Sequence, residues 1–271
     1  MVSPAMKIIH TLGTVFFFTA IACFGVQHFV HASFTTAQKT MGYPWIPVPH
    51  WLANVVGFIL VLVCVAVTTR RYARLAVMLL AILLLVRAIV AFAPSLALNP
   101  RSGAIWTPLF ELVAMSGASL YIAGSLLGNW PHATGWEKIF LFCKRTGPFL
   151  FAVALIIFGA QHFIYAHYVA TLVPSWIPGH LFWAYFVGFA FLAAATAILS
   201  GRGTGPATVL LGTMFCSWVV LVHAPRVIGA LRNGFEWTSG FVALAMSGAA
   251  FLFTNMTPER PDRAGQRQQP Q

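Results

Sequence analysis

The chain has 271 residues, of which 59% are hydrophobic and only 8% are charged. Soluble domains usually carry about 25% charged residues, so this composition excludes an ordinary soluble fold and favours a lipid bilayer as the solvent. The net charge of +11 comes without a basic stripe of interleaved aromatic residues, which argues against nucleic-acid binding. The four cysteines form no C-x-x-C pair, so neither a disulfide framework nor a zinc site is predicted.

Eight apolar segments follow one another along the chain. A membrane helix needs about 20 mostly apolar residues, so the pattern predicts an all-α integral membrane protein with eight transmembrane helices. The first segment is interpreted as a membrane helix and not as a cleaved signal, because a matching segment recurs inside the chain. The predicted spans are residues 8–30, 51–69, 73–93, 106–127, 148–170, 181–200, 205–224 and 238–255.

The distribution of basic residues predicts the orientation of the spans. With the N-terminus inside, the inner segments carry eleven Lys and Arg residues and the outer segments carry four, while Arg87 lies within a span. Cytoplasmic loops of membrane proteins carry the excess of Lys and Arg. We therefore expect a multi-pass protein of a cell membrane, in particular the bacterial cytoplasmic membrane, with both termini in the cytoplasm.

The second half of the chain repeats the first, with a shift of 134 residues in the first helix and 131 thereafter. Four spans return the chain to the side where it began, so the copies share one orientation, about a pseudo-two-fold axis along the membrane normal. We predict two tandem four-helix bundles at 1–127 and 148–255, a cytoplasmic linker at 128–147 and a disordered cytoplasmic tail at 256–271. The matching motifs are residues 24–29 with 158–163, 45–47 with 176–178, 106–107 with 237–238, and 114–118 with 245–249.

These motifs resemble those of the DoxX-like membrane protein family. The resemblance rests on Phe-Gly-x-Gln-His-Phe at the end of the first helix, on Trp-Ile-Pro before a second helix with Gly-Phe, and on the Trp-Thr start and Met-Ser-Gly-Ala run of the fourth helix. It covers both repeats, whereas most members of the family are single units. It implies a bacterial four-helix membrane bundle, and some members resemble the small membrane subunit of thiosulfate:quinone oxidoreductase.

The first helix of each repeat ends in a Gln-His pair, Gln27-His28 and Gln161-His162. Such a histidine either bonds a neighbouring carbonyl at the interface or serves as a proton-exchanging or quinone-bonding group. Haem ligation would need facing histidines at one depth and is less favoured. His31 follows at i+3, but copy two has Tyr165 there and no carboxylate cluster accompanies it, so no metal site is predicted. We expect the histidines to point into their bundles and the glutamines to bond across to neighbouring helices.

Further polar and aromatic residues recur near the outer ends of the spans. Arg101 and Arg232 each precede a tryptophan by five residues, and they are either snorkelling side chains or contacts for an anion or headgroup. Trp45 and Trp176, in the Trp-Ile-Pro segments, are expected to plug the interface or to cover a site. The Met-Ser-Gly-Ala runs are expected to form faces for close helix packing.

One candidate pair occurs only in copy one. Arg87 and Glu111 are predicted to lie at the same depth on adjacent helices, and copy two has Trp218 and Val242 in their places. Their joint presence and joint absence predict a pair, since an isolated charge at this depth costs about 2.5–3.5 kcal/mol. The pair either fixes helix packing or forms an asymmetric polar site.

The leading functional hypothesis is an accessory or quinone-interacting subunit of a membrane redox system, with its site at the outer face. One alternative is a transporter or carrier of a small molecule between the halves. Another is a structural or assembly protein that docks an outer-face partner. The sequence shows no nucleophile–base pair, phosphate loop or complete metal site, so an enzymatic activity of its own stays open. The expected partners are the bilayer and a redox protein.

Overall fold

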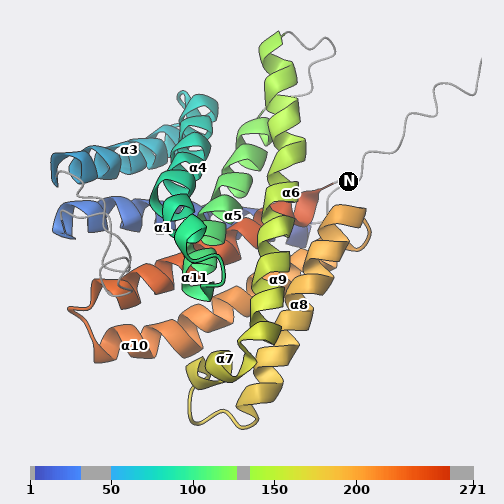
Figure 1. Cartoon of the computed structure of the whole chain (residues 1–271). Helices are drawn as coiled ribbons and strands as arrows, with labels where there is room; N and C mark the ends of the chain where they lie inside the picture. Colours follow the sequence, from blue (N-terminus) through green and yellow to red (C-terminus); the bar gives the residue numbers. More distant parts are fainter. Residues whose placement is uncertain (1–3, 32–49, 127–134, 257–271) are drawn as a thin grey trace, which may run out of the picture.

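The computed structural model describes residues 4–31, 50–126 and 135–256, and it is built from helices (Figure 1). In this part of the chain, eight segments are long and apolar enough to cross a membrane. The predicted all-α membrane fold is therefore confirmed. The elements are α1 (Pro4–His31), α3 (His50–Thr68), α4 (Ala73–Leu98), α5 (Gly103–Ser125), α6 (Gly135–Ile164), α7 (Ala166–Leu172), α8 (His180–Ser200), α9 (Thr204–Trp218), the π-helical turn η1 (Val219–His223), α10 (Ala224–Gly229), α11 (Gly234–Leu252) and the 3₁₀ turn η2 (Phe253–Asn255).

The proline near the end of the third span of each repeat does not stop the helix, although the predicted spans ended at or before it. Helix α4 continues through Pro94 to Leu98. In copy two, the turn η1 precedes Pro225 and joins α9 to α10, so that this span reaches Gly229. Proline removes one backbone donor, and membrane helices accommodate it through local π adjustments and neighbouring groups.

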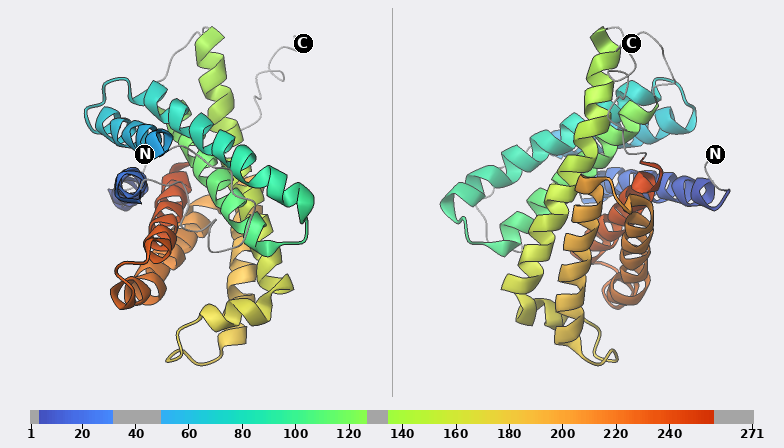
Figure 2. Two further views of the ribbon diagram at one scale, coloured as in Figure 1. Left: turned by 60° about the vertical axis from the view of Figure 1, so that its left-hand side comes forward. Right: turned by 90° about the vertical axis from the view of Figure 1, so that its right-hand side faces the viewer.

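Helix α6 begins at Gly135, inside the segment that the sequence assigned to the linker. Its first turns protrude beyond the neighbouring helices (Figures 1 and 2). Phe140, Cys143 and Gly147 are buried, and an added Cβ at Gly124 of α5 would meet Lys144 at 2.5 Å. Helix α6 thus begins well before the apolar segment, because one side of its first turns packs on α5.

The two repeats exchange helices where they pack. One group contains α3, α1, α11 and α9 in spatial order, and the other contains α4, α5, α6 and α8. Each group therefore takes two helices from each repeat, and within the described residues the first helix of a repeat does not pack along the fourth helix of the same repeat. In Figure 1, α6 and α8 run steeply down the picture, whereas α1, α9 and α10 run across it.

Pairs of glycines mark the two most extensive contacts between the repeats, α1 with α11 and α5 with α6. A Cβ added at Gly13 of α1 would lie 2.9 Å from the carbonyl oxygen of Gly248 in α11, and one at Gly117 of α5 would lie 2.5 Å from that of Gly147 in α6. Gly117 and Gly248 belong to the Met-Ser-Gly-Ala runs. The predicted role of these runs in close helix packing is confirmed, and the closely approaching helix comes from the other repeat.

The serines of the same runs hold the third helix of their own repeat. The Ser116 hydroxyl donates to the carbonyl of Ala81, and the Ser247 hydroxyl donates to that of Gly212, both at 2.8 Å. At the centre of the molecule, the fully buried Phe253 ring packs between Tyr121 and Phe151, with both ring centroids 4.9 Å away. Each fourth helix is thus fixed on both sides, which positions its first turn for the site described below.

Candidate functional site

The Gln-His pairs lie at one end of each helix group, named here the glutamine end, where α1 and α6 approach their ends and α5 and α11 begin. The Gln27 amide nitrogen donates to the carbonyl of Gly234 in α11 at 3.4 Å. The Gln161 amide nitrogen donates to the carbonyl of Gly103 in α5 at 3.2 Å. The predicted bonds across to neighbouring helices are confirmed. They are reciprocal between the repeats, as a pseudo-two-fold relation requires.

Each glutamine also accepts a hydrogen bond from a threonine of the same partner helix. The Thr238 hydroxyl donates to Gln27 at 3.4 Å, and the Thr107 hydroxyl donates to Gln161 at 3.1 Å. The sequence analysis did not single out these threonines, although the recurring Trp-Thr dipeptide contained the signal. Both bonds of Gln27 are longer than those of Gln161, so the α1–α11 junction is the looser of the two.

A groove of about 530 Å³ lies between α1 and α11 at the glutamine end, and we name it the α1–α11 groove. Gln27 and Arg232 supply polar groups to its lining. The Val26 and Val30 side chains are largely exposed, so this wall is open at its side. The remaining wall is aromatic: Trp237 and Phe241 have ring centroids 5.7 Å apart. The groove therefore combines a cation and an amide with apolar and aromatic walls.

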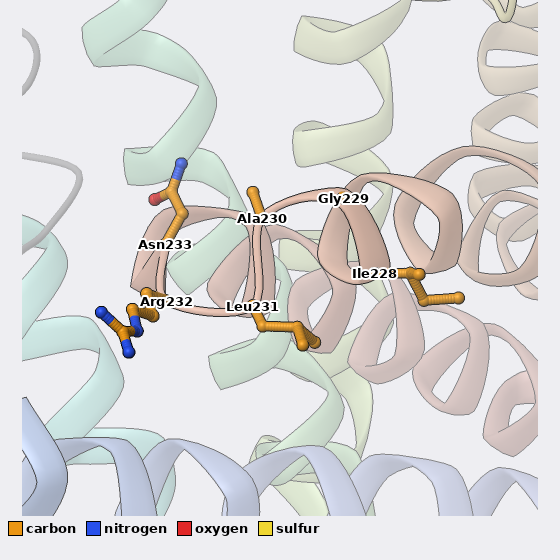
Figure 3. A pocket seen from close by; sticks show the side chains of 6 residues that line it. All are labelled: Ile228, Gly229, Ala230, Leu231, Arg232 and Asn233. Atoms are coloured by element: carbon orange, nitrogen blue, oxygen red, sulfur yellow. The ribbon is translucent and has the colours of Figure 1, made fainter.

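The turn before α11 places Arg232 at this groove. The Trp237 indole N–H donates to the carbonyl of Leu231 at 3.0 Å, and the Asn233 side chain accepts from the Phe235 amide at 3.0 Å as an N-cap. These bonds fix the turn from both sides. A neighbouring shallow hollow of about 550 Å³ runs along residues 228–233. Figure 3 shows the Leu231 and Arg232 side chains on the side of the turn opposite Asn233. Leu231 and Arg232 line both hollows, so the two adjoin.

Copy one has the same turn in front of α5. The Trp106 indole N–H donates to the carbonyl of Pro100 at 2.8 Å, and Arg101 is exposed like Arg232. The tryptophans therefore act as clamps of the turns that carry the arginines, in addition to the anchoring expected of interfacial tryptophans.

His28 is buried and points into the protein, as predicted. Its Nδ1 lies 2.7 Å from the carbonyl of Phe24, and its Nε2 lies 3.4 Å from an Arg87 guanidinium nitrogen. His162 makes the same backbone contact, at 2.8 Å to Phe158, and packs edge-on against the Phe191 ring of α8. The backbone contact of the histidine thus recurs in both repeats.

The predicted Arg87–Glu111 pair stays a prediction. The structure records a contact of Arg87 with His28, and Glu111 is half-buried on α5. The depth estimate placed both side chains at one level, and α4 brings the Arg87 side chain to His28 of α1. In copy two, Trp218 stands in place of Arg87 and packs against Phe191 and Phe215, which gives His162 an aromatic environment instead of a charged one.

The remaining predicted residues lie apart from the α1–α11 groove or outside the described residues. Trp176 is 67% exposed and does not line the groove. Trp45 with its Trp-Ile-Pro segment lies outside the described residues, as does the side chain of His31. Among the residues that the structure describes, no group of three or more His, Cys, Asp or Glu side chains is placed to hold a metal ion.

Comparisons of the chain with known protein families, with curated proteins and with solved structures found no match. The resemblance to the DoxX-like family therefore stays a prediction from the motifs.

Proposed function

We propose that this membrane protein binds an isoprenoid quinone in the α1–α11 groove and serves as an accessory, quinone-interacting subunit of a membrane redox system. The observation that carries the proposal is the composition of the groove, which sets Gln27 and Arg232 beside apolar and aromatic walls. A quinone has the matching chemistry, with two carbonyl acceptors on a flat ring and a long apolar tail.

The polar groups of the groove suit a neutral head with acceptor oxygens. A glutamine amide has two N–H donors; one Gln27 donor bonds Gly234, which leaves the second for a ligand carbonyl. The exposed Arg232 guanidinium supplies further donors, and hydrogen bonds from a charged group contribute about 1.5–3 kcal/mol. The Trp237 and Phe241 rings offer faces for stacking a quinone ring.

The apolar side of the groove suits the tail. Val26 is 53% and Val30 is 70% exposed on the outer surface of α1, which is a surface that lipid covers in a membrane helix. A tail that follows this wall leaves the groove over apolar side chains. Phospholipids share this amphipathic form, so the experiment has to separate the two ligands.

The pseudo-symmetry of the chain supplies a matched pair of variants for that experiment. We expect decylubiquinone to bind the purified protein in nanodiscs, and Arg232→Gln to weaken binding about tenfold or more, since a lost charge-assisted bond costs at least about 1.4 kcal/mol. Arg101→Gln removes the same charge from the other repeat, and we expect less than about a twofold change.

Titration of the quinone, with and without excess phosphatidylglycerol, is the measurement. Equal weakening of quinone binding in Arg232→Gln and Arg101→Gln would mean that only the general surface charge matters. Complete displacement of the quinone by excess phosphatidylglycerol would make the groove a lipid site. Absence of quinone binding to the natural protein would end the proposal.

The proposed site faces the outside of the cell if the basic residues set the topology as expected. With a cytoplasmic N-terminus, α1 and α11 bring the glutamine end to the outer face. We predict that a reporter enzyme fused after Gln271 is active only in its cytoplasmic form. Strong activity of a periplasmic reporter at that position would invert the orientation and place the groove at the inner face.

A further inference from the structure

The junction of α5 and α6 is the pseudo-symmetric counterpart of the α1–α11 groove. The repeat shifts carry Gln27 to Gln161 and Arg232 to Arg101. They also carry Trp237 to Trp106 and Phe241 to Phe110, and the last two rings are stacked with centroids 5.5 Å apart. Each residue that we assign to the quinone head in the first groove therefore has an equivalent residue of the same type at the second junction.

Tyr165, directly after α6, occupies the mouth of this second junction. Its hydroxyl donates to the carbonyl of Arg101 at 2.8 Å. Its ring lies so close to the Gly103 backbone that a Cβ added there would be 2.6 Å from a ring carbon. Arg101 and Gly103 are the counterparts of Arg232 and Gly234, both of which line the first groove. The tyrosine thus covers the positions where the head of a ligand would enter.

We propose that Tyr165 closes a second, latent quinone groove between α5 and α6, so that the duplicated chain carries one working site. This inference rests on the proposed function of the first groove. The tyrosine supplies from within the chain an aromatic ring beside the turn, where a quinone ring would lie. Its hydroxyl fixes that ring by donating to the Arg101 carbonyl, a bond that a quinone oxygen, which only accepts, would not make. The α1–α11 junction thereby keeps the ligand site, and the α5–α6 junction becomes a fixed packing surface.

The inference has consequences for the Gln161 junction. The Thr107 hydroxyl already donates to the Gln161 side chain at 3.1 Å. Replacing Tyr165 with alanine therefore opens space and removes only the hydroxyl that bonds Arg101, while Gln161 and Thr107 stay in place. The α5–α6 junction would then offer the Gln161 amide, the Arg101 guanidinium and the Trp106 ring. These are the counterparts of the three groups that α1 and the start of α11 offer in the first groove.

Binding stoichiometry of decylubiquinone in nanodiscs tests the proposal. We expect one quinone per natural chain and two per Tyr165→Ala chain, with the added site lost again in the Tyr165→Ala/Arg101→Gln double variant. Tyr168→Ala is the control, because that side chain is 67% exposed on α7 and touches neither groove. Tyr165→Phe keeps the ring and should leave the stoichiometry at one.

The outcomes separate this proposal from the proposed function. A folded, monodisperse Tyr165→Ala protein that still binds one quinone overturns the closure by Tyr165. If the natural chain binds none, the proposed function fails, yet a site gained in Tyr165→Ala still supports the closure and no gain overturns it. If Tyr165→Ala does not fold, the milder Tyr165→His, which places there the residue type of copy one, is titrated in its stead and judged by the same outcomes.

Discussion

Replacing Gly147 with alanine is expected to break the contact between α5 and α6. The added Cβ would meet the Gly117 carbonyl oxygen and would lie 2.7 Å from the backbone nitrogen of Tyr121. Neither partner is a flexible side chain, so the two helix backbones have to move apart, and the loss of stability should be about 3 kcal/mol. Thermal unfolding in detergent, together with size-exclusion chromatography, measures the effect.

A control lies on the same helix. Gly135 has no atom within 4 Å of an added Cβ, so Gly135→Ala should unfold at the same temperature as the natural chain or slightly above it, because alanine favours helix. Gly13→Ala, at the α1–α11 contact, should behave like Gly147→Ala. Equal unfolding temperatures for Gly147→Ala and Gly135→Ala would show that the close backbone contact does not exist.

Separating the repeats should have an equally large effect. Because α1 packs on α11 and α5 packs on α6, residues 1–127 alone leave the glycine faces of both α1 and α5 without partners. We expect neither 1–127 nor 128–271 to accumulate in membranes when expressed alone. Expressed together, the two fragments should copurify as a one-to-one complex.

This coexpression experiment distinguishes helix groups that take helices from both repeats from two bundles that each consist of one repeat. In the second arrangement, each fragment would accumulate on its own and the two would not copurify. A matched control carries Gly147→Ala in the second fragment, which should weaken recovery of the complex although both fragments are present.

The number of spans, the repeat and the packing role of the Met-Ser-Gly-Ala runs could be predicted from the sequence, because each rests on a local or repeated pattern. The bonds of Gln27 and Gln161 across to other helices could also be predicted. The helix that receives each bond could not be predicted. Gly103 and Gly234 are equivalent positions of the two repeats, so only the packing of the helices decides which of them lies next to Gln27.

Arg87 shows the limit of arguments from depth. Equal height on adjacent helices leaves the direction of each side chain open, so the contact of Arg87 with His28 of α1 could not be predicted from depth alone. Tyr165 stands where copy one has His31, and the groups that the repeats share assign it no role. Its ring contact with Gly103 shows that a difference between repeats can mark a site as well as an identity does.

Photolabelling with an azido-quinone is the most direct measurement of where a quinone binds. After irradiation of the protein in nanodiscs and digestion, we predict label in two peptides, one containing Val26 to Val30 of α1 and one containing Trp237 to Phe241 of α11, and loss of both labels with excess decylubiquinone. Label confined to other helices, or label in these peptides that excess quinone does not reduce, would contradict the account.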